Sequence, residues 1–557
     1  MKFLFALLAI LTLIPAASLA QPRLRIVRTG TDVVVAWPEA YPRFNLQTSV
    51  NLGDPLAWTN YSILPASSGT EFTVTIPATN SVGFFRLLCV AALIDVPDPT
   101  YFDANCDGID GNATNAIFVA PPPFGSDTAT GSMRQPVASI QKGIQNAVAT
   151  GKSDVYVARG SYTSTNALAL ASGVNLYGQF DGTTNWLRSA TNETVINGPS
   201  TAVFADSISN ARVEGFRIVA AAATGPGQSS YAIRVRGTTA LVLRYNSIVA
   251  GLPGLGAAGL DGTNGLPATG GGPGSGGSCD GSGFGIGGPG GTSPCGRTGG
   301  AGGRGGSEGA NSGFGGGIGL IATPGGPGGG GGGTGGRGGN GTTGADGVTG
   351  NHGFPSSSGS ATSGVYLAGQ AFAGADGAHG HGGGGGGGGG GQGGTFVNDG
   401  SGNGGGGGGG GGCAGTSGLG GTGGGGSFGI FITAPAQVTI EGNVFVTQSG
   451  GTGGSGGNGG VGGLFGMGAA GGTICTGEVG GGGNGGNGGR GGAGGSGSGG
   501  PGGPSVGIFW TAGSNLNLSG NSFTIGNGGP GGFGGTTPGV GSAPNGSAGI
   551  SLNTFQQ

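Results

Sequence analysis

Charged side chains are scarce in this chain of 557 residues, and lysine is nearly missing. Lys and Arg total 20 against 23 Asp and Glu, and Lys142 and Lys152 are the only lysines after Lys2. A protein that binds nucleic acid needs a basic surface to neutralise phosphates. We therefore expect no nucleic-acid partner.

Long apolar runs are also missing beyond the N-terminus, where a spanning helix would need about 20 residues. Lys2, the apolar run from Phe3 to Ile14 and the small residues before Gln21 are typical of a secretory signal peptide. The sequence thus predicts cleavage after Ala20, a secreted or cell-surface protein, and no transmembrane segment in the mature chain.

A pair of catalytic carboxylates cannot be found either. Glycoside hydrolases place two carboxylates around the scissile bond. The candidate acids are scattered singly: Asp181, Glu193, Asp206, Glu214 and Glu441. Asp376, His379 and His381 form one other polar cluster, and such ligands could hold a transition metal. No fourth ligand accompanies them, so we interpret this cluster as incidental and predict no catalytic site.

Glycine, in contrast, supplies 153 residues, mostly in long tracts. The tracts cover roughly 251–316, 324–361, 374–426, 449–504 and 526–546. Many run as Gly-Gly-x triplets, and three residues per turn is the period of the polyproline II helix, which has no internal hydrogen bonds. Two glycines per triplet would let neighbouring helices approach and pair their backbones. This pattern resembles the polyglycine II bundles of some phage adhesins and glycine-rich antifreeze proteins. Disorder is the alternative, because glycine loses much entropy on ordering.

A repeat of about twenty residues returns between the tracts. Its copies are "SYAIRVRGTTALVLRYNSI" from Ser230, "SFGIFITAPAQVTIEGNVF" from Ser427, "SVGIFWTAGSNLNLSGNSF" from Ser505 and a truncated one from Ser547. Two short β-type runs in a fixed frame indicate one coil of a parallel β-solenoid. The repeated Asn246, Asn443 and Asn521 are interpreted as turn residues that tolerate the left-handed conformation and can stack in a ladder.

If the coils stack in register, all glycine-rich tracts should leave from the same edge of the solenoid. We place short returning strands between the first tracts, at 318–322 and 364–368. Both lie at short apolar runs, "IGLIA" and "GVYLA".

The solenoid is expected to begin with a capping helix. Val137, Ile140, Ile144 and Ala147 fall on one helical face, and a strand follows at 155–157. The residues around them are Pro136, Ser139-Ile140-Gln141, Val155-Tyr156-Val157-Ala158, Gly160 and Tyr162. They resemble the entry to the right-handed parallel β-helices of the pectate-lyase-like superfamily. The resemblance implies that fold and raises the possibility of a polysaccharide-active or carbohydrate-binding protein, although fold analogy is a weak warrant for activity.

The segment from Leu24 to Leu88 reads as a small β-sandwich. Short alternating runs recur at about ten-residue spacing with turn residues between them. The sequence resembles an immunoglobulin- or fibronectin-like module of secreted bacterial proteins. Trp37 and Trp58 are interpreted as packing residues of this unit.

An acidic loop, "YFDANCDGIDGN", follows the sandwich. Asp103, Asn105, Asp107 and Asp110 are spaced so that their oxygens could surround one hard cation, with Gly108 in the turn. The loop resembles the calcium loops of dockerin-like and thrombospondin-type repeats, but Thr114 replaces the bidentate glutamate of an EF-hand. Calcium binding and a metal-free linker rich in Asx-turns both remain open.

Six cysteines in an exported chain suit disulfides, and six allow fifteen connectivities. Neighbours in sequence suggest Cys89–Cys106, Cys279–Cys295 and Cys413–Cys475. Such bridges would restrain the loose glycine-rich tracts.

The sequence therefore predicts an all-β protein in which a right-handed parallel β-helix carries glycine-rich insertions of the polyglycine II kind. Five parts are expected: a signal peptide (1–20), a sandwich (21–90), a linker with the calcium loop (91–115), the cap and first coils (116–250), and coils with glycine-rich insertions (251–557). We expect a structural or adhesion-type protein whose partners are extracellular polysaccharide or cell-surface and matrix components. A polysaccharide-active or carbohydrate-binding protein is the main alternative. An ice-binding or matrix protein is less favoured, because no regular Thr array is present.

Overall fold

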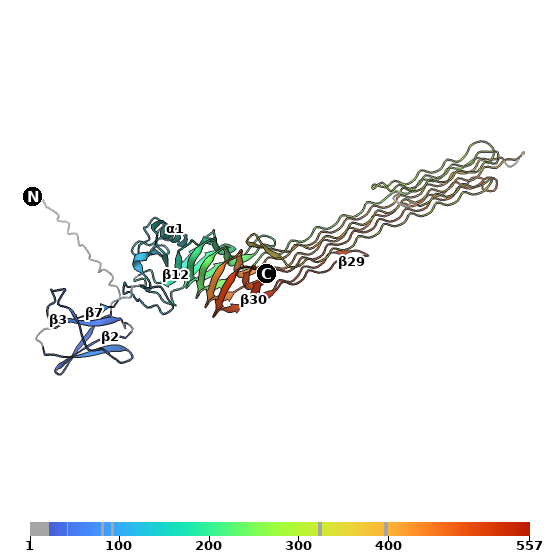
Figure 1. Cartoon of the computed structure of the whole chain (residues 1–557). Coiled ribbons are helices and arrows are strands. Elements are labelled where there is room, and N and C mark those ends of the chain that lie inside the picture. The colour runs from blue at the N-terminus through green and yellow to red at the C-terminus, as the bar shows by residue number, and fades with distance from the viewer. Residues whose placement is uncertain are drawn as a thin grey trace, which may run out of the picture.

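The computed structural model describes residues 22–39, 41, 43–79, 83–90, 94–183, 185–320, 326–394 and 399–557. The expected signal peptide (1–20) lies outside these residues. Figure 1 shows a β-rich N-terminal unit, a central stack of strands and a long bundle of extended segments. Apart from one α-helix and a short 3-10 helix (Ala113–Asn115), every named element of the described chain is a strand. The all-β prediction is confirmed at this level.

The N-terminal unit consists of two antiparallel sheets. One sheet has the order β1-β2-β6-β5 and the other β4-β3-β7. Their bounds are β1 (Arg25–Thr29), β2 (Asp32–Pro38), β3 (Phe44–Ser49), β4 (Thr59–Asn60), β5 (Ala66–Ser67), β6 (Glu71–Pro77) and β7 (Phe84–Cys89). Val35, Trp37, Leu46 and Val74 form the buried core between them. Trp37 is thus a packing residue, as expected from the sequence.

The central stack contains three parallel sheets, and after its first strand each turn of the chain adds one strand to each sheet. We call it the three-sheet unit. The seven-stranded sheet contains β8 (Ala116–Val119), β9 (Asp154–Ala158), β12 (Asn175–Phe180), β15 (Ser209–Glu214), β18 (Thr239–Arg244), β23 (Gln437–Glu441) and β26 (Asn515–Ser519). The second sheet has six strands, β10 (Gly160–Thr163), β13 (Thr194–Gly198), β16 (Arg217–Ala220), β19 (Ser247–Val249), β24 (Val444–Val446) and β27 (Ser522–Thr524). The third sheet also has six, β11 (Leu168–Ala169), β14 (Thr201–Asp206), β17 (Ser230–Arg236), β22 (Ser427–Thr433), β25 (Ser505–Trp510) and β30 (Ser551–Gln556). This topology is compatible with a parallel β-helix.

The core of the three-sheet unit follows from the alternation of side chains along each strand. In β22, Ile430 and Ile432 point inward and meet the inward residues of β18, Leu241 and Leu243, in one apolar cluster. Full burial of such a side chain stabilises the fold by about 1.5–3 kcal/mol. The cluster runs from Ile117 to Ile508, so it continues through every coil.

The predicted helix is confirmed as α1 (Ile140–Thr150), which packs against β8 and β9. Ile140, Ile144 and Ala147 are buried on one face. The Ser139 side chain accepts a hydrogen bond from the Lys142 N–H, and Gly151 ends the helix in the left-handed conformation. Within the described part of the chain, no helix has the length and hydropathy needed to cross a membrane.

The repeat sets the register of the coils. Ser230 pairs with Ser427, Ser427 with Ser505, and Ser505 with Ser551. The last copy is therefore aligned at Ser551 and not, as expected, at Ser547. Ser547 belongs to a glycine-rich tract instead, where its carbonyl accepts the Gly502 N–H.

The repeated asparagines form a ladder, as expected, but the predicted left-handed residue is wrong by one position. The left-handed residues are Tyr245, Gly442 and Gly520, each directly before an asparagine. This turn lets Asn246 and Asn443 point into the coil, where both are buried.

Three glycine-rich excursions interrupt the coils, at residues 251–426, 447–504 and 525–550. The returning strands expected inside the first one are wrong. Residues 318–320 form no strand, because the Leu320 N–H bonds to the Thr298 carbonyl in the neighbouring tract; residues 321 and 322 lie outside the described chain. β21 (Val365–Leu367) pairs antiparallel with β20 (Ser360–Thr362) and adds no strand to the coils. A second hairpin, β28 (Thr536–Thr537) with β29 (Gly541–Ser542), lies in the last excursion.

Candidate functional site

The excursions assemble into one body, the glycine-rich bundle, formed by residues 251–320, 326–359, 369–394, 399–426, 448–504 and 525–550. Figure 1 shows its tracts side by side, leaving the three-sheet unit in one direction. Backbone hydrogen bonds join neighbouring tracts at every third residue. One series is Gly256 N to Thr452 O, Gly259 N to Ser455 O, and Gly262 N to Asn458 O. Both partners advance by three, so these two tracts are parallel. Where one partner advances and the other recedes, as in Gly404 N to Ser275 O and Gly407 N to Gly272 O, the tracts are antiparallel.

The uninterrupted glycine run 382–391 lies at the centre of the bundle. Its N–H groups donate in rotation to three tracts: Gly385 to Gly317, Gly386 to Gly406, and Gly387 to Gly339. Its carbonyls accept in the same rotation from three others: Gly303 N to Gly386, Gly329 N to Gly385, and Gly483 N to Gly387. Six neighbours therefore surround this run, and the backbone groups of these glycines are satisfied.

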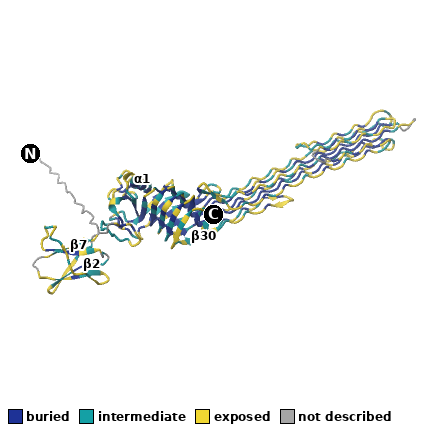
Figure 2. Cartoon of the chain, viewed as in Figure 1, coloured by how far each residue is buried: buried dark blue, intermediate teal, exposed yellow. Residues whose placement is uncertain are grey.

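Glycine is required here by space. A Cβ atom on any residue from Gly382 to Gly391 would lie 1.8–2.2 Å from a backbone carbonyl oxygen of a neighbouring tract. The run is buried throughout (Figure 2). The two longest all-glycine runs of the sequence, 382–391 and 404–412, are both buried throughout.

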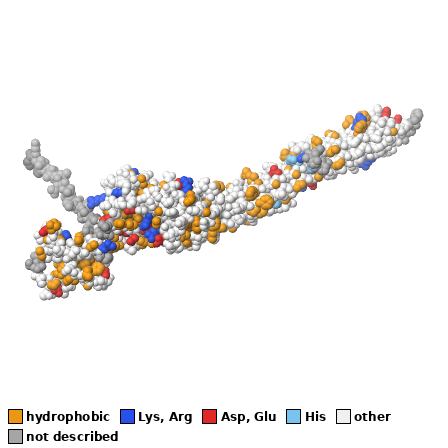
Figure 3. All heavy atoms as spheres, in the orientation of Figure 1, with side chains coloured by type: hydrophobic (Ala, Val, Ile, Leu, Met, Phe, Trp, Pro, Cys, Tyr) orange, Lys and Arg blue, Asp and Glu red, His pale blue; other side chains and the backbone are white. Residues whose placement is uncertain are grey.

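The rim tracts expose the third residue of each triplet. Between 451 and 467 the exposed positions Thr452, Ser455, Asn458, Leu464 and Met467 alternate with pairs of mostly buried glycines. Many exposed rim side chains are large and apolar, and Figure 3 shows them along the length of the bundle. They include Leu260, Leu266, Val348, Phe354, Phe372, Leu419, Leu464, Met467 and Phe533.

Some apolar rim residues are neighbours across tracts. The Phe372 N–H donates to the Phe354 carbonyl, and the Leu419 N–H donates to the Leu260 carbonyl. The four side chains are 62%, 69%, 48% and 72% exposed, in that order. The rim therefore presents pairs of apolar side chains to solvent.

Short polar side chains at the rim bind the neighbouring backbone. Asp261 Oδ1 accepts from the Asn458 N–H at 2.6 Å, and Asn340 Oδ1 accepts from the Asn484 N–H at 2.9 Å. His379 Nδ1 likewise accepts a hydrogen bond from the Ala414 N–H, at 2.8 Å. Asp376 Oδ1 does the same for Ser417, at 2.7 Å. Asp376 and His379 thus both stabilise the pairing of neighbouring tracts.

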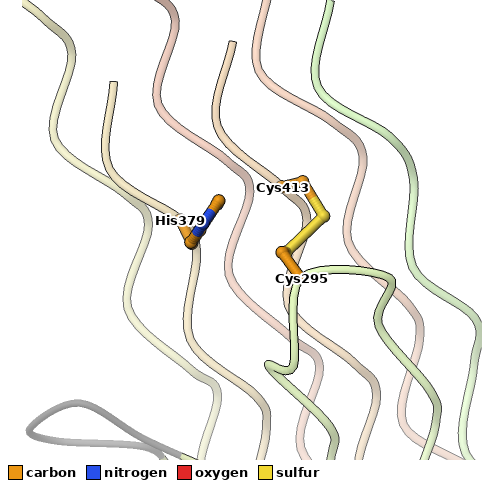
Figure 4. Close-up of side chains that lie close together, drawn as sticks. All are labelled: Cys295, His379 and Cys413. Carbon is orange, nitrogen blue, oxygen red and sulfur yellow. A yellow bond between two sulfur atoms is a disulfide. The ribbon is translucent and has the colours of Figure 1, made fainter. Parts of the chain in front are cut away.

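Two disulfides lie in the bundle, and the pairing expected from sequence neighbours is wrong for both. The bonds are Cys279–Cys475 and Cys295–Cys413, whereas Cys89–Cys106 is confirmed. Tract pairing explains the correction, because it brings cysteines 196 and 118 residues apart to Cα–Cα distances of 5.5 and 5.7 Å. His379 lies beside the second bond (Figure 4), and its ligand nitrogen is within 4.8 Å of both sulfurs.

The serine of each repeat ties the coil to its excursion. Ser230 Oγ accepts from the Gly251 N–H at 3.0 Å, and Ser427 Oγ donates to the Gly251 carbonyl at 3.0 Å. Gln448 is bound in the same way: Ser427 Oγ accepts its N–H, and Ser505 Oγ donates to its carbonyl. Each excursion leaves after a strand of one six-stranded sheet (β19, β24 or β27) and returns at the first residue of a strand of the other (β22, β25 or β30), so the single exit edge expected from the sequence is found.

The acidic loop brings three of its four predicted ligands together. Asp103 accepts from the Gly108 N–H, Asn105 from the Asp107 N–H, and Asp107 from the Ala113 N–H. Asp95, which the sequence did not single out, joins them by accepting from the Gly111 N–H. Burial raises the pKa of Asp95 and Asp103.

Asp110 points away from this loop. Its Oδ2 accepts from Arg188 Nη1 at 3.1 Å, and both side chains are 1% exposed. Arg188 also binds Glu214 at 3.1 Å. Burial raises the pKa of Asp110 to about 7, with the nearby Arg188 charge acting in the opposite direction.

The scattered acids of the three-sheet unit are all paired with arginine. The ion pairs are Asp181–Arg159, Glu193–Arg217, Asp206–Arg236, Glu214–Arg188 and Glu441–Arg244. Each carboxylate has a structural partner, and none of these acids pairs with another.

Comparisons with known proteins add no relative: no family model matches the chain, and neither a curated protein nor a solved structure is significantly similar to it.

Proposed function

We propose that this is a secreted or cell-surface structural protein of the adhesion type, in which the three-sheet unit anchors a projecting glycine-rich bundle. The observation that carries the proposal is the division of the bundle into a glycine-rich interior paired through its backbone and a rim with exposed apolar side chains. Exposed apolar patches mark interaction surfaces in soluble proteins.

The bundle is suited to this role because it is held together along its length. The three-residue period and the six neighbours of the run 382–391 support assignment of the tracts to polyglycine II helices. Each hydrogen bond contributes only about 1 kcal/mol net, but the bonds recur at every triplet. An ordered rod presents its side chains in fixed positions, whereas a flexible linker would lose conformational entropy when it binds a partner.

The three-sheet unit is proposed to be a right-handed parallel β-helix like those of the pectate-lyase-like superfamily. Its three parallel sheets, the cap α1 and the register of the serines support this assignment. The N-terminal unit is likewise proposed to be immunoglobulin- or fibronectin-like, on its two packed antiparallel sheets. Export is supported by three disulfides, which persist in oxidising compartments.

A carbohydrate-binding function is the second candidate. A pocket of about 420 Å³ between α1 and the second sheet is lined by apolar residues such as Pro121 and Leu168 and by uncharged polar residues that include Ser139, Gln141, Asn166 and Asn197. Such groups recognise sugar hydroxyls, whereas hydrolysis needs two carboxylates. The lining contains no carboxylate. The pocket therefore favours binding over turnover.

Calcium is proposed as a ligand of the acidic loop, with Asp95 replacing Asp110 in the set of Asp103, Asn105 and Asp107. Oxygen-only donors are the ligands that calcium prefers. In the described chain these oxygens accept the loop's own N–H groups, and no three of the carboxylates converge within 4.8 Å. Binding therefore requires the loop to open its Asx-turns, which implies modest affinity.

The proposed function is tested by retention of the full chain on cells and on extracellular matrix. Leu260, Leu419, Phe354 and Phe372 are replaced together by serine, and the expected result is a large loss of retention. The control replaces Leu56 and Leu64, which are 90% and 88% exposed on the N-terminal unit. Equal retention of both variants would refute the role of the rim, and release of reducing ends from a glycan panel would refute a non-enzymatic function.

A further inference from the structure

One arginine interrupts an aromatic row on the outer face of the third sheet. The row follows the strand register through Phe204, Arg234, Phe431, Phe509 and Phe555. Phe431 and Phe509 stack at 4.5 Å, and Tyr366 of the β20–β21 hairpin packs on the same aromatic cluster. A charged residue in such a row costs desolvation and needs a physical reason.

Within the described chain, the Arg234 guanidinium contacts rings and has no carboxylate partner. Its central carbon lies 4.8 Å from the centroid of Phe204 and 5.6 Å from that of Tyr231. Its Nε is buried without a hydrogen-bond acceptor, and burial lowers the pKa of this guanidinium. Arg236, the other arginine of the same strand, already forms an ion pair with Asp206.

A second unsatisfied polar atom lies close by. Thr433 Oγ1 is buried without a partner. The hairpin turn at Gly364 touches both groups, since a Cβ there would lie 3.6 Å from Thr433 Oγ1 and 3.7 Å from an Arg234 Nη atom. Most buried polar groups are paired, so two unpaired polar atoms at one place are unusual.

Arg234 also lines a pocket of about 570 Å³ between the third sheet, the hairpin and the root of the bundle. Ser200, Thr201, Gln228 and Ser229 contribute polar side chains, and Tyr366 contributes an aromatic wall. The pocket lining contains no acidic residue. It therefore combines one unneutralised positive charge with hydroxyl and amide groups.

We propose that this pocket binds a hydroxylated carboxylate, with the carboxylate on the Arg234 guanidinium and the hydroxyl groups of the ligand on Ser200, Thr201 and Gln228. A guanidinium held against rings keeps its N–H fork in one orientation, and charge-assisted bonds to a carboxylate are about twice as strong as neutral ones. The site lies on the three-sheet unit and does not depend on the proposed role of the rim.

The test is calorimetric titration of the full chain with gluconate, with its neutral counterpart sorbitol, and with acetate. Gluconate is expected to bind saturably, acetate more weakly and sorbitol not measurably. Arg234→Gln is expected to weaken gluconate binding about 10-fold or more. The matched control is Arg236→Gln, which removes a neighbouring arginine already occupied by Asp206 and should retain binding.

Three results would overturn the site: no gluconate binding by the natural chain, equal binding by Arg234→Gln, or equal binding of sorbitol. If acetate bound as tightly as gluconate, the proposed arginine–carboxylate contact would stand, but the proposed contacts with the ligand's hydroxyl groups would be refuted. Thermal unfolding of both variants shows whether they fold. If Arg234→Gln fails to fold, Ser200→Ala with Thr201→Ala provides the second variant, for which weaker gluconate binding and unchanged acetate binding are expected.

Discussion

Asn246 Nδ2 donates a hydrogen bond of 3.0 Å to Asn443 Oδ1 although the two residues are 197 positions apart. The same oxygen accepts the Asn246 backbone N–H at 3.0 Å. Asn443 repeats the contact with Asn521 Oδ1, at 3.0 Å from its N–H and 3.2 Å from its side chain. The ladder thus joins coils on both sides of the longest excursion.

Replacing Asn443 by alanine should destabilise the three-sheet unit by about 1–3 kcal/mol, because the Asn246 backbone N–H becomes buried without an acceptor. Chemical denaturation measures the free energy of unfolding. Asn521→Ala, at the partly exposed end of the ladder, should cost less. If Asn521→Ala lowered the free energy of unfolding as much as Asn443→Ala or more, the ladder would not be the source of this stability.

Gly386→Ala should disrupt the bundle, since its Cβ would lie 2.1 Å from the Gly483 carbonyl oxygen. Gly330→Ala is the matched control because nothing lies within 4 Å of its Cβ. Amide hydrogen exchange across 449–504 is the measurement: protection should fall in the first variant and persist in the second. Uniformly unprotected amides in the natural protein would contradict an ordered bundle altogether.

Mass spectrometry of peptides from the unreduced protein should recover Cys279–Cys475 and Cys295–Cys413. Both links follow from tract pairing, so recovery of Cys279–Cys295 would contradict that pairing. Replacing Cys295 and Cys413 together by serine should lower stability by about 2–5 kcal/mol, as for other native disulfides.

Asp110 should make stability fall as pH rises. Its pKa is about 7 in the folded protein against an ordinary 3.8, so the folded state binds the proton more tightly than the unfolded state. The free energy of unfolding should therefore decrease between about pH 4 and pH 7. Asp110→Asn should flatten this decrease in unfolding temperatures measured from pH 4 to 8.

Asp206 provides a control of opposite sign. Its hydrogen bonds with Arg236 lower its pKa, so its stabilising contribution is lost on acidification. Asp206→Asn should therefore leave the decrease between pH 4 and pH 7 in place. An identical pH profile for Asp110→Asn and the natural chain would contradict the raised pKa.

Calcium at millimolar concentration should raise the unfolding temperature, and a chelator should reverse the shift, because a ligand that binds only the folded state stabilises it. Asp103→Asn should reduce the shift, whereas Asp110→Asn should not. A shift of equal size in magnesium would point to general charge screening rather than a calcium site.

The sequence predicted those parts of the fold that depend on local pattern. The face Ile140–Ile144–Ala147, the alternation in β22 and the serines of the first three repeat copies all follow from periodicity. Predictions failed where partners distant in sequence compete for a segment. Ile318 and Leu320 look like strand residues, but the N–H groups of Gly319 and Leu320 bond to neighbouring glycine-rich tracts, and the side chains of Ile318 and Leu320 remain exposed.

The candidate sites depended even more on distant contacts. Cys279 meets Cys475 only once the tracts have been placed beside one another, and no spacing rule contains that information. Asp110 resembles its neighbours in the acidic loop, yet Arg188, far along the chain, withdraws it into an ion pair. Arg234 was indistinguishable from any strand arginine until the register placed it in a row of rings.

The all-glycine run at the centre of the bundle has a thermodynamic consequence. Unfolding the run 382–391 would expose amide groups and almost no hydrocarbon, and polar exposure lowers the heat capacity whereas apolar exposure raises it. The three-sheet unit, with its aliphatic core, should have the strongly curved stability profile of ordinary proteins. The stability of the glycine-rich bundle should vary little with temperature. Cooling would therefore destabilise the three-sheet unit before it destabilises the bundle.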